Sequence, residues 1–447
     1  MITLHKFLNK VNLTVALSGI LLLQACNKEL PEAIPIDHPK GSPTETIMKK
    51  LDAAEFSILK TAVEKASTFA SPTGKLSDIL GNPDGELTFF APDNTAVLTS
   101  FTLLGLPANA ASLNFFSAGK LDTLLKYHII GGRTLKTANF TSSFPNMYMQ
   151  SALLLAPPSV ALPPGLRMPI FLDKEGSASF VNYIPIVGAD IAASNGVIQK
   201  PAIALLPPDQ VLWQRIATDP DYSYFRAAVL KADEGDAAKT LQSALSNPAA
   251  NLTVYAPTNA AFQALLTAQI TPGALPLVKQ GYIMQALVPA VKAANPGISD
   301  ADALIMATAL AETEPHKTTI FNMAKAQAAA IASTPDVFNN PAVAGVLTPT
   351  LVKGIVVYHI MGVRAYTVNM PTTQANFPTL LNGAIAAHPG IGLKAVFGAT
   401  GVTSATVKGA ANATASNIVI DPYVNGTSDQ SCINGVIQSL DQVLLPQ

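Results

Sequence analysis

The chain is poor in the residues that carry most metal and redox chemistry. Among 447 residues there are only two cysteines and six histidines, so neither a disulfide framework nor a cysteine-rich zinc site is expected. The sequence contains no Gly-x-Ser-x-Gly elbow and no His-Glu-x-x-His motif. The segment "GIGLKA" at 390–395 has the glycines of a dinucleotide loop, but no acidic residue follows at the expected distance. We therefore predict that the protein is not an enzyme and has no catalytic residue, no cofactor and no metal.

The chain also lacks an excess of either charge. Lys plus Arg total 28 and Asp plus Glu total 29, and no basic run is interleaved with aromatic residues. A nucleic acid partner is therefore not expected. Charged residues make up 13% of the chain and hydrophobic residues 49%, which excludes a disordered chain and predicts buried cores. The length favours two domains.

The N-terminus has the pattern of a secretory signal. A basic flank precedes an apolar run at 11–25 that is too short to span a bilayer comfortably. The run ends in "LLLQAC", which resembles a bacterial lipobox, with Leu23 three positions before Cys26. The resemblance implies that residues 1–25 are a lipoprotein signal peptide and that Cys26 carries lipid on its thiol and new amino end. The alternative is an ordinary signal followed by a buried or free cysteine.

Residues 26–45 form a predicted tether. They are rich in proline and show neither a helical nor a strand period. Several acyl chains on Cys26 would hold the protein stably on a membrane, and no later segment is predicted to span one. We expect a lipid-anchored position in the cell envelope, at the outer membrane, and the sequence leaves open whether the protein faces the periplasm or the medium.

Three motifs occur twice, in the same order. "LTFFAPDNTAV" at 87–97 matches "LTVYAPTNAAF" at 252–262; "YHIIG" matches "YHIMG" at His128 and His359; and "NGVIQ" recurs at Gly196 and Gly435. A period this long indicates two tandem domains rather than a solenoid of short repeats.

Each motif predicts a local structure. The apolar runs at 87–90 and 252–255 are expected to be buried strands, and the proline after each turns the chain. Asp93 and Thr258 then provide N-caps for the helices that follow. The Tyr-His motifs lie where a helix is expected to run into a strand, and each Asn-Gly pair is expected to form a tight turn.

This set of motifs resembles the fasciclin domain, and the likeness covers nearly the whole chain after residue 46. The resemblance implies an α+β fold in which a twisted β-wedge packs against several helices. We predict two tandem fasciclin-like domains at 46–210 and 211–447, joined so closely that they should touch.

The second copy carries an extra alanine-rich segment at about 267–346. Ser299 is expected to cap one helix of this segment, and a second helix should end before Pro335. Such helices must bury their apolar faces on their own domain, on the first domain or on a partner.

The fasciclin resemblance also implies candidate interaction residues. In animal relatives the Tyr-His region and the Asp-Ile segment before Asn-Gly-Val are implicated in cell adhesion. The alternative for both histidines is a partly buried imidazole that serves packing. The second copy lacks the Asp-Ile pair, and Gln199 and Gln438 stand where many relatives have histidine. By position the candidates are Tyr127, His128, Asp190, Ile191, Tyr358 and His359.

Two functions remain open from the sequence. The first is a non-enzymatic, lipid-anchored protein that mediates adhesion or binds an extracellular protein or polysaccharide, with a cell-surface, matrix or polysaccharide ligand as its partner. The second is a surface receptor for a glycan or small molecule that uses the helical insertion of the second domain. A pocket lined by the insertion would favour the receptor.

Overall fold

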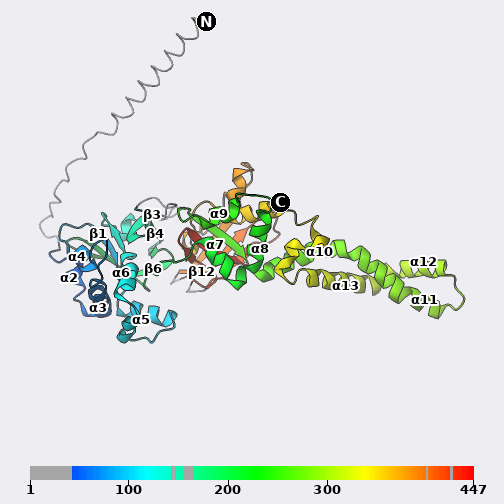
Figure 1. Ribbon diagram of the computed structural model, residues 1–447, viewed down its shortest axis with the longest axis horizontal. Helices are drawn as coiled ribbons and strands as arrows, with labels where there is room; N and C mark the ends of the chain where they lie inside the picture. Colours follow the sequence, from blue (N-terminus) through cyan, green and yellow to red (C-terminus); the bar gives the residue numbers. More distant parts are fainter. Residues whose placement is uncertain (1–42, 142–143, 145–146, 156–164, 399–400, 423–425) are drawn as a thin grey trace, which may run out of the picture. The chain divides into compact units, whose positions relative to one another are not determined.

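A computed structural model describes residues 43–141, 144, 147–155, 165–398, 401–422 and 426–447. Residues 43–447 form one compact unit that contains two β-sheets and their covering helices (Figure 1). The predicted signal peptide, Cys26 and all but the end of the predicted tether lie outside the described residues.

The first sheet has seven strands in the order β2-β1-β7-β6-β5-β4-β3. The neighbouring strands β1 and β7 are parallel and the other pairs are antiparallel. The strands are β1 (Leu87–Phe90), β2 (Ile129–Gly131), β3 (Met147–Leu154), β4 (Arg167–Glu175), β5 (Ala178–Val181), β6 (Ile184–Ala193) and β7 (Gly196–Pro201).

The second sheet repeats this order as β9-β8-β15-β13-β12-β11-β10, with the short strand β14 also paired to β15. Here β8 and β15 are the parallel pair. The strands are β8 (Leu252–Pro257), β9 (Ile360–Met361), β10 (Ala375–Phe377), β11 (Ile391–Gly398), β12 (Gly401–Lys408), β13 (Ser416–Ile418), β14 (Gln430–Cys432) and β15 (Gly435–Leu440). The strand order confirms the predicted α+β fold with two tandem domains.

The repeated Asn-Gly turns have a steric reason. A Cβ atom at Gly196 would lie 2.0 Å from the carbonyl oxygen of Leu87, and one at Gly435 would lie 2.4 Å from that of Leu252. Each glycine therefore permits the parallel strand pair of its domain to form. The preceding Asn195 and Asn434 are fully buried and hydrogen-bond to the helices of their own domains.

Helices cover one face of the first sheet and bury a core with it. The N-cap predicted at Asp93 is present, since its side chain accepts a hydrogen bond from the Ala96 backbone N–H at 3.0 Å. The helical elements are α2 (Ile47–Lys50), η1 (Ala54–Phe56), α3 (Ser57–Ala66), α4 (Leu76–Gly81), α5 (Asn94–Leu103), η2 (Ala110–Phe115), α6 (Ala118–Lys126) and η3 (Thr137–Asn139).

The second domain has an equivalent helical layer and core. Thr258 caps α10 as predicted, accepting from the Ala261 backbone N–H at 3.2 Å. The elements are α7 (Leu212–Thr218), η4 (Pro220–Tyr222), α8 (Ser223–Ala232), α9 (Thr240–Ser246), α10 (Asn259–Tyr282), α14 (Pro349–Tyr358), η8 (Thr367–Asn369) and η9 (Leu380–Gly383).

The insertion extends α10 and returns along α13, and these two helices lie side by side (Figure 1). Ser299 caps α12 and α13 ends before Pro335, as predicted. The additional elements are η5 (Ile283–Leu287, a π-helical turn), α11 (Val288–Ala294), α12 (Asp300–Ala311), α13 (His316–Ile331), η6 (Pro335–Asn339) and η7 (Pro341–Val343).

The helical segment 259–294 is long and apolar enough to cross a membrane by length and composition, although no span was expected from the sequence. A third of its most apolar window is buried in the protein. Its first turns supply Phe262 and Leu266 to the core of the second domain, so this end of the segment is a core helix.

Candidate functional site: a groove between the two domains

The asparagine of each Ala-Pro-x-Asn motif is a structural residue. Asn94 accepts a hydrogen bond from the Ile58 backbone N–H at 3.0 Å and donates to the Ala54 carbonyl oxygen at 2.9 Å. Asn259 makes the same two kinds of bond in the second domain. The asparagine of the motif therefore links the strand–helix turn to an earlier helical segment of the same domain. Because both domains contain this link, the motif occurs in both.

The two histidines of the Tyr-His motifs are fully buried. His128 Nδ1 donates to the Leu124 carbonyl oxygen at 2.9 Å, and its Nε2 accepts from the Leu205 backbone N–H at 2.9 Å. His359 bonds in the same way within the second domain, at 2.8 and 2.9 Å. Burial lowers the pKa of both imidazoles to about 4, so each is neutral at pH 7 and holds two backbone segments together.

The tyrosines of these motifs are also buried. Tyr127 Oη donates to the Pro169 carbonyl oxygen at 3.2 Å and accepts from Asn182 Nδ2 at 3.1 Å. Tyr358 is likewise bonded on both sides of its hydroxyl. In this conformation neither Tyr-His pair presents a surface for direct contact with a partner. Of the six candidates, only Asp190 and Ile191 are partly exposed.

Asp190 lies at a bulge in β6 with a left-handed backbone, φ 58°. Its carboxylate accepts from the Thr137 backbone N–H and hydroxyl, both at 2.9 Å, and from Gln199 Nε2 at 2.7 Å. Burial tends to raise the pKa of Asp190, but these hydrogen bonds outweigh it and the pKa is lowered. Gln199 therefore orients this aspartate.

The second domain contains an equivalent aspartate that the sequence comparison missed. Asp429 has φ 53° and accepts from the Thr367 backbone N–H at 2.7 Å, the Thr367 hydroxyl at 2.6 Å and Gln438 Nε2 at 2.7 Å. Asp190 and Asp429 each stand five positions before the asparagine of an Asn-Gly turn. That common spacing was the available signal, but the following residue differs, isoleucine in one copy and glutamine in the other.

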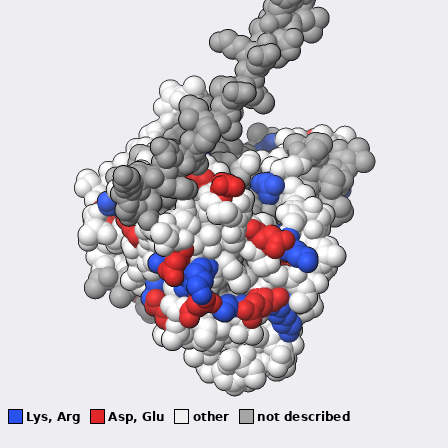
Figure 2. Space-filling view, turned by 90° about the vertical axis from the view of Figure 1, so that its left-hand side faces the viewer, with Lys and Arg blue, Asp and Glu red and all other residues white. Residues whose placement is uncertain are grey.

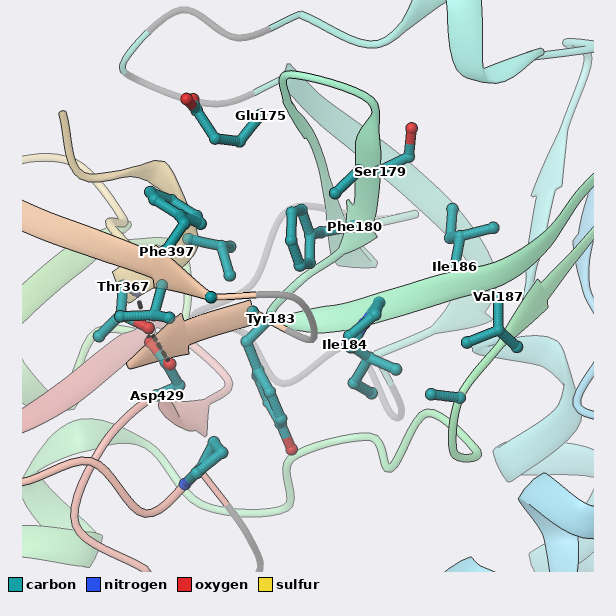
Figure 3. A pocket seen from close by; sticks show the side chains of 18 of the residues that line it. Glu175, Ser179, Phe180, Tyr183, Ile184, Ile186, Val187, Thr367, Phe397 and Asp429 are labelled. Carbon is teal, nitrogen blue, oxygen red and sulfur yellow. Dashed lines mark hydrogen bonds between the residues drawn. The ribbon is translucent and has the colours of Figure 1, made fainter. Parts of the chain in front are cut away.

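The surroundings of the two aspartates differ. Asp429 is 3% exposed, and burial raises the pKa of its carboxyl group. It also lines a groove of about 950 Å³ between the two domains, which we call the interdomain groove (Figure 3).

The interdomain groove is built from hairpins of both sheets. The first domain contributes the β4–β5 turn and the start of β6, and the second contributes η8, the β11–β12 hairpin and the segment between β13 and β14. Figure 3 shows Phe397, Thr367 and Asp429 on one side and Ile186 and Val187 on the other.

Both aromatic rings and carboxylates line the groove. Phe180, Tyr183 and Phe397 line it together with Glu175, Asp421 and Asp429, and no Lys or Arg is among its described lining residues. The lining therefore disfavours an anionic ligand and suits a neutral or cationic one with apolar faces and hydrogen-bond donors.

Packing between the domains supports the groove. Phe171 of β4 lies 5.9 Å from Tyr366 of the second domain, measured between ring centroids. The guanidinium carbon of Arg364 lies 4.9 Å from the centre of the Phe171 ring. Arg364 is buried, and its Nε and Nη2 donate to the Asn251 side chain and the Ile433 carbonyl oxygen. The predicted contact between the domains is thus an aromatic and cation–π interface.

Metal-ligating and thiol side chains also occur in the described part of the chain. The described residues contain no group of three or more His, Cys, Asp or Glu side chains placed to hold a metal ion. The thiol of Cys432 is buried, and burial raises its pKa to about 12, so it is protonated at neutral pH and packs as a core residue.

Charges of both signs are interspersed on the face shown in Figure 2. Among its described residues, this face shows no extended patch of one sign. In the first domain, Lys200 Nζ pairs with Glu55 at 2.6 Å and Asp93 at 3.1 Å.

Comparisons with known proteins agree with the geometry. Residues 54–207 match the family model for the fasciclin domain. A solved structure that matches is a FAS1 domain pair from the insect cell adhesion molecule fasciclin I, described as a novel fold. The sequence identity is 16% and the TM-score is 0.28. The match covers 88% of this chain and 98% of that chain. None of the curated proteins compared matches the chain. The first domain is therefore a fasciclin domain, and the second repeats its strand order with an inserted helical segment.

Proposed function

We propose that the protein is a non-enzymatic, lipid-anchored protein of the cell envelope that binds an extracellular polysaccharide or protein and so mediates adhesion. The observation that carries the proposal is the interdomain groove, with its aromatic rings, carboxylates and absence of cationic lining among the described residues. Fasciclin domains are associated with adhesion or binding, which agrees with this role.

The chemistry of the groove favours a neutral polysaccharide over an anionic polymer. Sugar rings have apolar faces that can lie on Tyr183 and Phe397, which are both partly exposed. Their hydroxyl groups can donate to the carboxylates of Glu175 and Asp421. An extended protein segment with few acidic residues is the other ligand class that this lining admits.

The N-terminal sequence supports a position at a membrane. A lipidated Cys26 followed by the proline-rich tether would hold the two domains outside the bilayer. Attachment would place many copies on one surface, so individually weak contacts would add up through avidity.

The proposal is tested by binding assays on residues 26–447 carrying Cys26→Ser, against a panel of neutral and anionic glycans and matrix proteins. The variant Y183A/F397A should bind its ligand about 5- to 150-fold more weakly, because the two rings together contribute about 1–3 kcal/mol. The matched control is F115A, which removes an aromatic ring that is 68% exposed and outside the groove. Unchanged binding by Y183A/F397A, or no binding to any member of the panel, would refute the proposal.

The second candidate function is a small-molecule receptor that uses the helical insertion. A separate cavity where the insertion joins the second domain favours it.

A further inference from the structure

The second domain contains an apolar cavity of about 400 Å³, separate from the interdomain groove. It lies between α10 and α14 and is closed by η9 and the last residues of the chain. We propose that this cavity, the second-domain cavity, binds a small uncharged aromatic molecule. The inference develops the second candidate function and does not depend on adhesion through the groove.

The first domain has a cavity at the equivalent place, but its volume is only about 50 Å³. The equivalence follows from the helix caps. Asp93 caps α5 as Thr258 caps α10, and Ser117 caps α6 as Thr348 caps α14. Both cavities are therefore bounded by the corresponding pair of helices.

Two aromatic side chains occupy this space in the first domain. Phe101 stands eight positions after the cap Asp93, and Phe116 stands directly before the cap Ser117. Their rings are stacked, with centroids 6.1 Å apart, and both line the small cavity.

Leucines stand at the corresponding positions of the second domain. Leu266 is eight positions after Thr258, Leu347 directly precedes Thr348, and both line the larger cavity. The second domain thus has a branched aliphatic side chain at two positions where the first has a phenyl ring, and its own ring, Phe262, stands where the first domain has Val97. The rings of Phe262 and Phe338 that line the larger cavity favour an aromatic ligand, because aromatic rings pack well against one another edge to face or offset.

The lining matches an uncharged ligand. None of its described residues is Asp, Glu, Lys or Arg, and the exposed part of the lining includes Val346, Leu351 and Ile385, each at least half exposed. His388 also lines the cavity, but its Nε2 contacts the Pro446 carbonyl oxygen at 3.0 Å and its Nδ1 accepts from the Gly390 backbone N–H. An apolar ring therefore gains burial there without leaving a charged group unpaired.

The insertion completes this cavity. Ile270 on the extension of α10 and Phe338 of η6 line it, and the Phe338 ring lies 6.1 Å from that of Phe262, edge to face. The extra segment of the second domain thus supplies a wall that the first domain does not have.

The test uses N-phenyl-1-naphthylamine, an uncharged probe with a phenyl and a naphthyl group whose fluorescence rises in apolar surroundings, with residues 26–447 carrying Cys26→Ser. We expect saturable binding at one site per chain. The variant L266F/L347F restores the aromatic pair of the first domain and should weaken binding at least tenfold.

The controls separate occupancy from misfolding. Thermal unfolding of each variant reports its fold, and L347F alone provides a milder substitution if the double variant is unstable. Unchanged probe affinity in a folded L266F/L347F or L347F protein would overturn the proposal. Displacement of the probe by toluene supports an aromatic ligand, whereas displacement by decanoic acid but not by toluene would overturn that choice of ligand.

Discussion

At the scale of single residues, the duplication distinguishes structural roles from specific ones. Asn94 and Asn259, and likewise His128 and His359, make the same bonds in both domains. A contact required by the fold is expected to recur in this way, whereas a difference between copies is where a specific function can reside. Asp429 has both kinds of property. Its hydrogen bonds repeat those of Asp190, which indicates a structural role, and its position at the border of the interdomain groove is a difference between the copies.

Asp173 gives a prediction about pH. It lies on β4, is 3% exposed, and its strand packs against η8 of the second domain. Burial, with a smaller contribution from Glu175, raises the pKa of Asp173 to about 7. Between about pH 4 and 7 the folded protein therefore retains a proton that the unfolded chain has lost, so this group's contribution to stability falls as pH rises.

We expect D173N, which cannot ionise, to match the wild type near pH 4 and to exceed its free energy of unfolding by about 2–4 kcal/mol at pH 8. Urea denaturation at pH 4, 6 and 8 measures the difference. D84N, at an exposed aspartate, is the control and should follow the wild type throughout. Parallel curves for D173N and the wild type would contradict the prediction.

At the scale of elements, the insertion consists of two parts with separate cores. All the residues of its own apolar cluster, which includes Ile283, Ala307 and Ile320, lie within 273–320. The base of the insertion instead contributes Ile270 and Phe338 to the main core of the second domain. The predicted boundaries at about 267–346 therefore include residues on which the second domain depends.

A deletion series tests this division. Replacement of 273–320 by a short Gly-Ser loop should leave the melting temperature of the remaining protein within a few degrees of the wild type, because the main core is retained. Replacement of 267–346 should prevent stable folding of the second domain, since loss of a buried Phe alone costs about 3–5 kcal/mol. Circular dichroism during heating measures both. Equal stability of the two deletions would show that the base is dispensable.

At the scale of the whole molecule, the interface around Phe171 couples the domains. Phe171 is 2% exposed and contacts Tyr366 and Arg364 of the second domain. We expect the wild type to unfold in one calorimetric transition and F171A to unfold in two, because the coupling energy is lost while each domain retains its own core.

A double-mutant cycle with R364M isolates the cation–π contact. The effects of F171A and R364M should be non-additive by about 1–2 kcal/mol, as expected for a desolvated pair. Additive effects, together with one unchanged calorimetric transition in F171A, would show that the domains do not depend on this contact.

The site could be predicted only in part from the sequence, and the reason is physical. Tyr127 and His128 attract notice as a repeated motif, but repetition marks any residue on which the fold depends, and burial shows that their bonds are internal. The interdomain groove joins Glu175 to Asp421 and Phe397, which are far apart in the chain and share no motif. Their proximity depends on how two domains pack.

The sequence by itself determined the duplication, the capped helices after Asp93 and Thr258, and the helices of the insertion, whereas the α+β fold was implied by the resemblance to the fasciclin domain. The repeat, the caps and the helices depend on local propensity and on hydrophobic period, which a linear pattern records. Only the tertiary structure decided that Asp429 repeats the role of Asp190, that a groove lies between the domains, and that the cavity beside Leu266 and Leu347 is larger than its counterpart in the first domain. Volume and proximity are properties of packing, and packing depends on residues that are distant in sequence.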